Sequence, residues 1–190
     1  TGEQQMAFKI NIKDDPTLQK IIPNLTSLQP VEIVGRYNSV NDTIAIKGKI
    51  PKMVYNGNTI AGATIDVTTK GDSLVYNVII DDISNASFGL PYTKISGTVA
   101  NNVANYDLVL KDTKNKDQYI ISGTLKAKDN NNIVKFNADN FLLNYEKWRI
   151  PSDNSVILSE KGLLINNFNL SNDSSSIKIQ SKQNIANAPL

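Results

Sequence analysis

Two pairs of neighbouring carboxylates are the first residues of this sequence that could do chemistry. Asp14-Asp15 and Asp81-Asp82 would be the acid pair of a glycosidase if both side chains of a pair faced one sugar. Neighbouring residues of a strand point to opposite faces, so neither pair meets that requirement in a strand. Asp15 before Pro16 is instead typical of a helix start, since Asp caps and Pro takes the first helical position. We therefore predict a helix start and a turn at these two places.

No other pattern indicates a catalytic or metal site. The sequence contains no Cys and no His, so a Ser nucleophile would lack a His base and zinc would lack its usual ligands. Calcium is the realistic metal for oxygen ligands, but residues 129–132 and 171–174 lack the spacing of a calcium loop and are better explained as hairpin turns. We predict no catalytic residue, no cofactor, no metal and no enzymatic activity.

The elements that remain are short strands with alternating apolar residues. Ile44–Ile50, which Pro51 is expected to end, and Leu74–Ile80 are examples. Such strands recur about every 8–13 residues with turn residues between them, which is typical of all-β proteins. Asn clusters at 101–102, 130–132 and 166–167 are expected in turns, because Asn tolerates positive φ. Asn56-Gly57 predicts a hairpin turn.

Only residues 14–28 carry a helical pattern, with Leu18, Ile21 and Ile22 at helical spacing and Leu25 and Leu28 in a possible further turn. We expect this segment to be a helical plug over the apolar end of the sheet or a connector. The two interpretations are equally supported by the sequence.

Glycines recur in the middle of strands, at Gly35, Gly48, Gly97 and Gly123. A mid-strand glycine marks a bend or a close approach of another chain segment. We therefore predict one β domain over residues 1–190: an elongated, curled antiparallel sheet forming an open apolar groove, either a β-taco or a partly closed barrel, with one short N-terminal helix.

Composition and charge argue against nucleic acid as a partner and against a membrane-spanning segment in this chain. The 190 residues carry a net charge of +2, and only Arg36 and Arg149 are arginines, so the basic stripe of nucleic-acid binders is absent. No apolar run approaches the roughly 18 residues of a membrane span. The chain begins at Thr1 without a signal-peptide pattern, so we interpret it as an interior piece of a longer chain.

Because no catalytic or metal site is predicted, we expect any function to depend on the apolar residues of the strands. If the sheet is covered, they form an ordinary core. If it stays open, they line a groove that binds lipid or another chain. The residues expected to line it are Ile44, Ile46, Ile50, Leu74, Tyr76, Val78, Ile80, Ile95, Val99, Tyr106, Leu108, Leu110, Ile121 and Leu125.

A distinctive segment lies near the C-terminus. It contains Asn144-Tyr145 and Trp148, then Asp153-Asn154 and Gly162, and ends with the Asn-Phe-x-Leu-Ser-Asn stretch over 167–172. This pattern resembles the TamB-like translocation and assembly module proteins of Bacteroidetes, within the AsmA-like group. The similarity is close over residues 140–172 and loose elsewhere, where the segment from Leu25 to Gly48 is similar to the interior repeats of these proteins.

The resemblance implies a periplasmic segment of an envelope-spanning protein, held in the inner membrane by a helix outside this piece. It implies a hydrophobic conduit for lipid transport and outer-membrane assembly, with phospholipid or acyl chains as ligands. An outer-membrane barrel protein would be contacted through regions outside this chain. Trp148 would anchor the strand after it, or be an ordinary core residue. The alternative function is an adhesion or scaffold module with a β core and no ligand.

Overall fold

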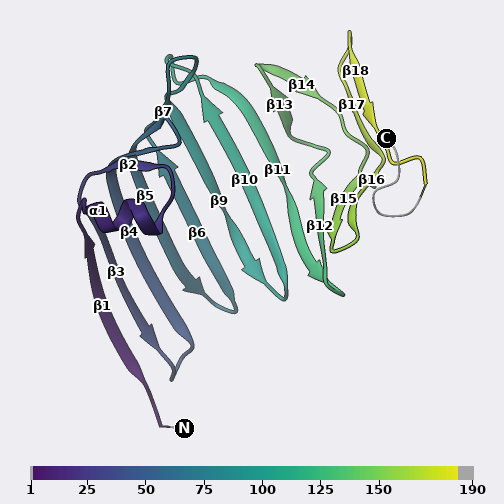
Figure 1. The fold of residues 1–190 in the computed structure, drawn as a ribbon. Helices are drawn as coiled ribbons and strands as arrows, with labels where there is room; N and C mark the ends of the chain where they lie inside the picture. Colours follow the sequence, from purple (N-terminus) through teal and green to yellow (C-terminus); the bar gives the residue numbers. More distant parts are fainter. Residues whose placement is uncertain (1, 184–190) are drawn as a thin grey trace. The chain divides into compact units, whose positions relative to one another are not determined.

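The computed structural model describes residues 2–183 and contains one short helix, α1 (Pro16–Ile21), among many strands (Figure 1). The strands are β1 (Gln5–Ile12), β2 (Leu25–Leu28), β3 (Val31–Asn38), β4 (Thr43–Tyr55), β5 (Asn58–Lys70), β6 (Ser73–Ile80), β7 (Asp82–Ser84), β8 (Gly89–Leu90), β9 (Tyr92–Ala100), β10 (Val103–Lys111), β11 (Asp117–Lys128), β12 (Asn131–Phe136), β13 (Phe141–Leu143), β14 (Glu146–Trp148), β15 (Ser155–Ser159), β16 (Gly162–Asn166), β17 (Phe168–Ser171) and β18 (Ser176–Ile179). The predicted all-β class is confirmed.

The main sheet contains 16 strands in the order β1-β3-β4-β5-β6-β9-β10-β11-β12-β15-β16, with the short strands attached beside this path. β17 and β18 form a separate hairpin. The pairings within each half of the chain are antiparallel, as predicted. The chain divides into two compact units: unit 1 comprises residues 1–96 and 110–116, and unit 2 comprises 97–109 and 117–190. β9 and β10 contribute residues to both units, which are described separately below.

Asn-containing turns connect several strands as the sequence predicts, although Asn131 and Asn132 belong to β12 and Asn166 to β16. Asn56 and Gly57 both have positive φ, as do Asn101 and Asn102, and Asn167 separates β16 from β17 in the same conformation. A two-residue turn with both φ angles positive matches the twist of the strands that it joins.

The helix α1 begins as predicted but is shorter. The Asp15 carboxylate accepts a hydrogen bond from the Thr17 backbone N–H at 2.7 Å, and Pro16 occupies the first turn. Hydrogen bonds from the Thr17 side chain and then from its backbone hold the pKa of Asp15 below the usual 3.8. No helix within residues 2–183 is long and apolar enough to cross a membrane.

Residues 25–28, expected in a further helical turn, form β2 instead. Asn24 has a φ of 70°, which ends the helical path. Leu28 then pairs with Met53 of β4, so tertiary strand pairing overrides the local i, i+3 spacing of Leu25 and Leu28.

Unit 1 bends along a line of residues that lie opposite one another on neighbouring strands. The registers place Pro30 opposite Pro51, Pro51 opposite Gly62, and Gly62 opposite Asp81. Neither proline donates a ladder hydrogen bond, and Gly62 has a φ of 65°, a conformation that other residues rarely adopt. We call this line the bend; it gives unit 1 the curl that the sequence predicts.

The bend corrects one prediction and refines another. β4 does not end at Pro51 but passes through it, because its pairing with β5 continues on both sides of the proline, from Ile50 and Ala63 to Lys52 and Ala61. Gly35, Gly48 and Gly123 do not have positive φ. Gly35 and Gly123 are instead close-approach sites, where a Cβ would meet the Phe8 ring and the Lys135 backbone oxygen respectively.

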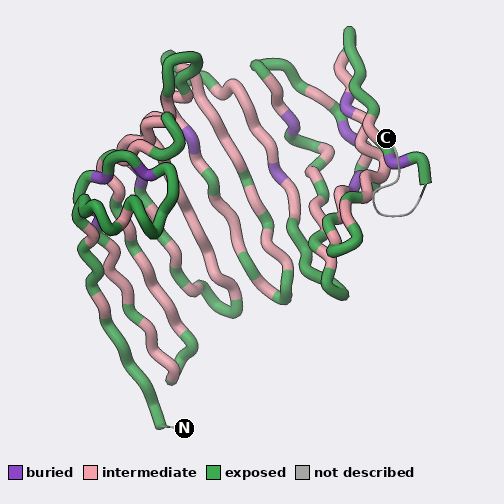
Figure 2. The backbone as a smooth tube through the Cα atoms, viewed as in Figure 1, coloured by how far each residue is buried: buried purple, intermediate pink, exposed green. Residues whose placement is uncertain are grey.

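The buried core of unit 1 lies in the inside corner of the bend. Leu25, Leu28 and Val31 are buried there, and the partly buried side chains packed against them come from both sides of the bend and from the helix: Ile12, Leu18, Ile33, Ile50 and Met53. Figure 1 shows α1 and β2 at the end of β3 and β4 that lies away from the N-terminus. In Figure 2 the buried residues of unit 1 gather at this same end.

Unit 2 has its own core around Phe141, Ile150 and Leu170. The ring of Phe136 packs edge-on against Phe141 and Phe168, at centroid distances of 6.0 and 5.4 Å. Phe168 and Leu170 belong to the β17–β18 hairpin, so this hairpin contributes to the core of the sheet in unit 2.

Asn154 extends the ladder of unit 2 with its side chain. It is fully buried, at 0% exposure. Its Oδ1 accepts a hydrogen bond from the Phe136 N–H, and its Nδ2 donates to the Phe136 carbonyl, both at 2.8 Å, and to the Pro151 carbonyl. The side-chain amide therefore forms with the Phe136 backbone the pair of hydrogen bonds that a residue of a neighbouring strand would form.

We predict that Gly62→Ala lowers the free energy of unfolding by about 1–3 kcal/mol, because Ala at positive φ is strained and its Cβ would meet the Asp81 side chain. Urea unfolding followed by circular dichroism measures this. The control is Gly48→Ala, whose Cβ would meet Ile65 at an ordinary 3.5 Å. Equal effects of the two substitutions would contradict the role assigned to Gly62.

We predict that Asn154→Ala destabilises the protein by about 2–4 kcal/mol, because it leaves the buried backbone N–H and carbonyl of Phe136 unpaired. Trp148 packs against the same cluster, so its fluorescence reports the unfolding of unit 2. Asn137→Ala, at a nearby exposed position, should change stability by no more than about 0.5 kcal/mol. An equally small loss for Asn154→Ala would refute the prediction.

Candidate functional site

One face of unit 1 is formed by mainly apolar residues that are register partners of one another across five strands. Ile46 lies opposite Gly35 on one side and Val67 on the other, and Val67 lies opposite Tyr76. Cross-strand partners project from the same face, and so do alternate residues along a strand. The face thus comprises Met6, Phe8, Ile10 and Ile12; Val31, Ile33, Gly35 and Tyr37; Ile44, Ile46, Gly48 and Ile50; Ala63, Ile65, Val67 and Thr69; and Leu74, Tyr76, Val78 and Ile80. We call this the apolar face.

The apolar face carries no charged residue and is largely uncovered within unit 1. Only Val31 and Ala63 are buried, at 5% and 4% exposure. Met6 and Ile10 are 54% and 45% exposed, and most other positions are half-buried. Figure 2 shows the strands of unit 1 mainly as intermediate or exposed away from the bend. An uncovered apolar surface of this kind is typical of a binding site.

The opposite face of the same strands carries their charged residues, together with apolar ones such as Val34, Val75 and Ile79. Lys9 and Glu32 form an ion pair at 2.5 Å, and Lys47 and Asp66, which are register partners, lie 3.7 Å apart. Exposed pairs of this kind add little stability, but they keep this face hydrated. The sheet of unit 1 therefore has one face with hydrated charged side chains and one apolar face.

The sequence-predicted groove residues do not all lie on one face. The structure brings seven of them together on the apolar face: Ile44, Ile46, Ile50, Leu74, Tyr76, Val78 and Ile80. Ile95 and Val99 lie on β9 and are each 37% exposed. Tyr106, Leu108 and Leu110 alternate along β10 and are half-buried.

The remaining two predicted residues lie on β11 in unit 2. Ile121 packs against the Phe141 cluster, whereas Leu125 is 39% exposed. Leu125 belongs to an in-register row that continues through Val134, Val156 and Ile165. The structure does not place these residues on the apolar face of unit 1.

The predicted set omitted the contributions of β1, β3 and β5 to the apolar face. Phe8, Ile10 and Ile12 alternate in the sequence, as do Ile65 and Val67, so period-two alternation was the signal that could have found them. Phe8 also has a specific position, because its ring occupies the space beside Gly35, its register partner.

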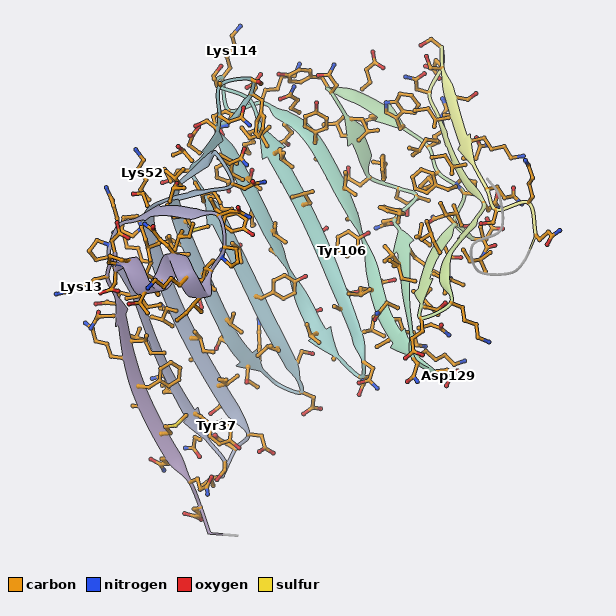
Figure 3. All side chains as sticks on the ribbon, in the orientation of Figure 1. Lys13, Tyr37, Lys52, Tyr106, Lys114 and Asp129 are labelled. Atoms are coloured by element: carbon orange, nitrogen blue, oxygen red, sulfur yellow. The ribbon has the colours of Figure 1, made fainter. Side chains whose placement is uncertain are left out.

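Tyr106 covers Gly123 within unit 2 in a related manner. A Cβ on Gly123 would lie 2.6 Å from the Tyr106 hydroxyl oxygen, and that hydroxyl donates a hydrogen bond to the Lys135 carbonyl at 3.3 Å. Tyr106 is labelled in Figure 3, where it lies along the strands of unit 2. Its role is therefore tied to local packing in that unit.

A polar hollow of about 810 Å³ in unit 2 is the alternative site. Its lining includes Glu146 and Asp173, but Asn172 donates to Glu146 at 2.8 Å and Arg149 pairs with Asp173. Among residues 2–183, no group of three or more acidic, His or Cys side chains is arranged to hold a metal ion. This hollow offers no arrangement from which a reaction can be derived.

The residues that carry the family resemblance have structural roles in unit 2. Asn144 and Tyr145 form the two-residue turn between β13 and β14, both with positive φ. Trp148 pairs with Phe141 and packs against the core, which agrees with the second of its two predicted roles, an ordinary core residue. The indole N–H of Trp148 is buried without a hydrogen-bond partner among the described residues.

If the apolar face is uncovered in solution, Val67→Glu should leave the protein folded and reduce binding of the apolar dye 8-anilinonaphthalene-1-sulfonate at least about threefold. The matched control is Thr68→Glu, which adds the same charge to the next residue of β5 on the polar face and should leave dye binding unchanged. Unfolding by Val67→Glu, or equal dye binding by both variants, would contradict an uncovered face.

Comparison with known proteins returned no relative. No protein-family model, no curated protein and no solved structure matches the chain. The TamB-like resemblance therefore rests on the sequence motif alone.

Proposed function

We propose that this chain binds lipid acyl chains on the apolar face of unit 1 and acts as a segment of a hydrophobic conduit. The observation that carries the proposal is the apolar face itself, which has four in-register positions on each of five strands and no charge at any of them. An acyl chain needs a continuous surface without charges and no catalytic residue.

The energetics favour such a ligand. Each fully buried CH₂ group contributes about 0.8 kcal/mol, and a chain lying on an open face buries about half of its surface. A long acyl chain therefore gains several kcal/mol from an open face, which is enough for reversible binding. Reversible binding suits a conduit, from which the lipid has to leave again.

The wider setting follows from the motif over residues 140–172. In this proposal the chain is a periplasmic segment of an envelope-spanning TamB-like protein, anchored in the inner membrane and contacting an outer-membrane barrel protein through other regions. It would serve lipid transport and outer-membrane assembly. Asn144 and Tyr145 form a turn in unit 2, and Trp148 packs in its core. These roles are consistent with a motif that shapes the fold and does not bind the ligand.

Native mass spectrometry of the chain purified from bacterial membranes tests the proposal. We expect phospholipid or fatty-acid adducts on the wild-type chain and on Thr68→Glu, and their loss from folded Val67→Glu. A bare mass for the wild-type chain, together with no binding of added palmitate, would contradict the proposal. That result would favour an adhesion or scaffold module without a ligand.

A further inference from the structure

The two ends of the apolar face differ in how far they are closed. At the bend, the last row of the face consists of Ile12, Val31, Ile50, Ala63 and Ile80, of which Val31 and Ala63 are buried. Leu18 of α1 packs on the same corner together with Leu28 and Met53 from beyond the bend. This end is therefore covered by protein.

The opposite end of the apolar face is open. Its last row consists of Met6, Tyr37, Ile44, Thr69 and Leu74. Met6 is 54% exposed and the other four are at most half-buried. Figure 3 shows Tyr37 at the end of unit 1 far from Lys13 and Lys52, which mark the bend.

The polar groups of the face are confined to the half that includes the open end. The three hydroxyl-bearing side chains are Tyr37 and Thr69 in the last row and Tyr76 in the row beside it. The two rows nearest the bend contain only aliphatic side chains and Gly48. Polarity therefore falls steadily from the open end to the bend.

The length of the face suits one acyl chain. The first and last rows are six residues apart, which is about 20 Å along a strand. A lipid leaflet has a hydrocarbon thickness of about 15 Å, half of a bilayer core. An acyl chain with the length that it has in a leaflet thus fits along the strands without passing the bend.

From these observations, and resting on the proposed function, we infer that a linear acyl chain lies on the face along the strands in one direction. The methyl end lies at the bend, beneath Leu18 and against Ile12 and Ile50. The polar head lies at the open end, beside Tyr37 and Thr69. The reverse direction would press a charged head against the aliphatic side chains of the closed corner, which is costly.

Paramagnetic broadening of methyl NMR signals tests the direction. Stearate carrying a nitroxide near its methyl end should broaden Leu18, Ile12 and Ile50, and stearate carrying it near the carboxylate should broaden Met6, Ile44 and Leu74. Binding with the two patterns exchanged, or with no difference between the probes, would overturn the inferred direction and leave the proposed function standing. No broadening of the face by either probe would overturn both.

A charge placed at the open end gives a second readout. Met6→Lys adds an ammonium group at an exposed position of the last row, where the carboxylate is expected. It should tighten stearate binding about two- to fivefold, the effect of an exposed ion pair, and should not tighten binding of uncharged stearyl alcohol. Unchanged or weaker stearate binding by the folded variant would contradict the direction.

Discussion

The strand registers of unit 1 are the constraint on which its candidate site depends. Each pairing from β1 to β6 places mainly apolar residues opposite one another on one face and leaves the charged residues of these strands on the other. A slip of one residue in β4 or β5 would bring charged residues such as Lys47 or Asp66 onto the apolar face. The tight Asn-containing turns and the pairing of Phe8 with Gly35 hold these registers.

The bend converts this two-faced sheet into a site with a closed end. Pro30, Pro51, Gly62 and Asp81 lie side by side on neighbouring segments, so these four segments turn at the same depth. The buried core of unit 1 lies in the corner of the bend. Between the bend and the open end, the apolar face is not covered by any part of this unit. A stable core and an uncovered apolar surface thus occupy different parts of one sheet.

Much of the fold could be predicted from the sequence, because period-two alternation and Asn-Gly or Asn-Asn turns are local signals. The helix start at Asp15 and Pro16 was equally local. The bend was not predictable in this way, since it appears only when the registers bring Pro30 and Pro51 together. For the same reason the strand at Leu25–Leu28 was mistaken for a helical turn. β1, β3 and β5 were omitted from the candidate site, although the alternation in β1 and β5 is a local signal.

We propose that the apolar face is open to solvent and is covered by an acyl chain when lipid is present. Because the chain contains no Cys, single-cysteine variants report each face separately. Alkylation of Ile46→Cys by iodoacetamide should proceed readily in the free protein and slow at least about tenfold with palmitate, whereas Lys47→Cys on the polar face should react at the same rate with and without palmitate. No alkylation of the free, folded Ile46→Cys variant, or equal alkylation rates of this variant with and without palmitate, would contradict the account.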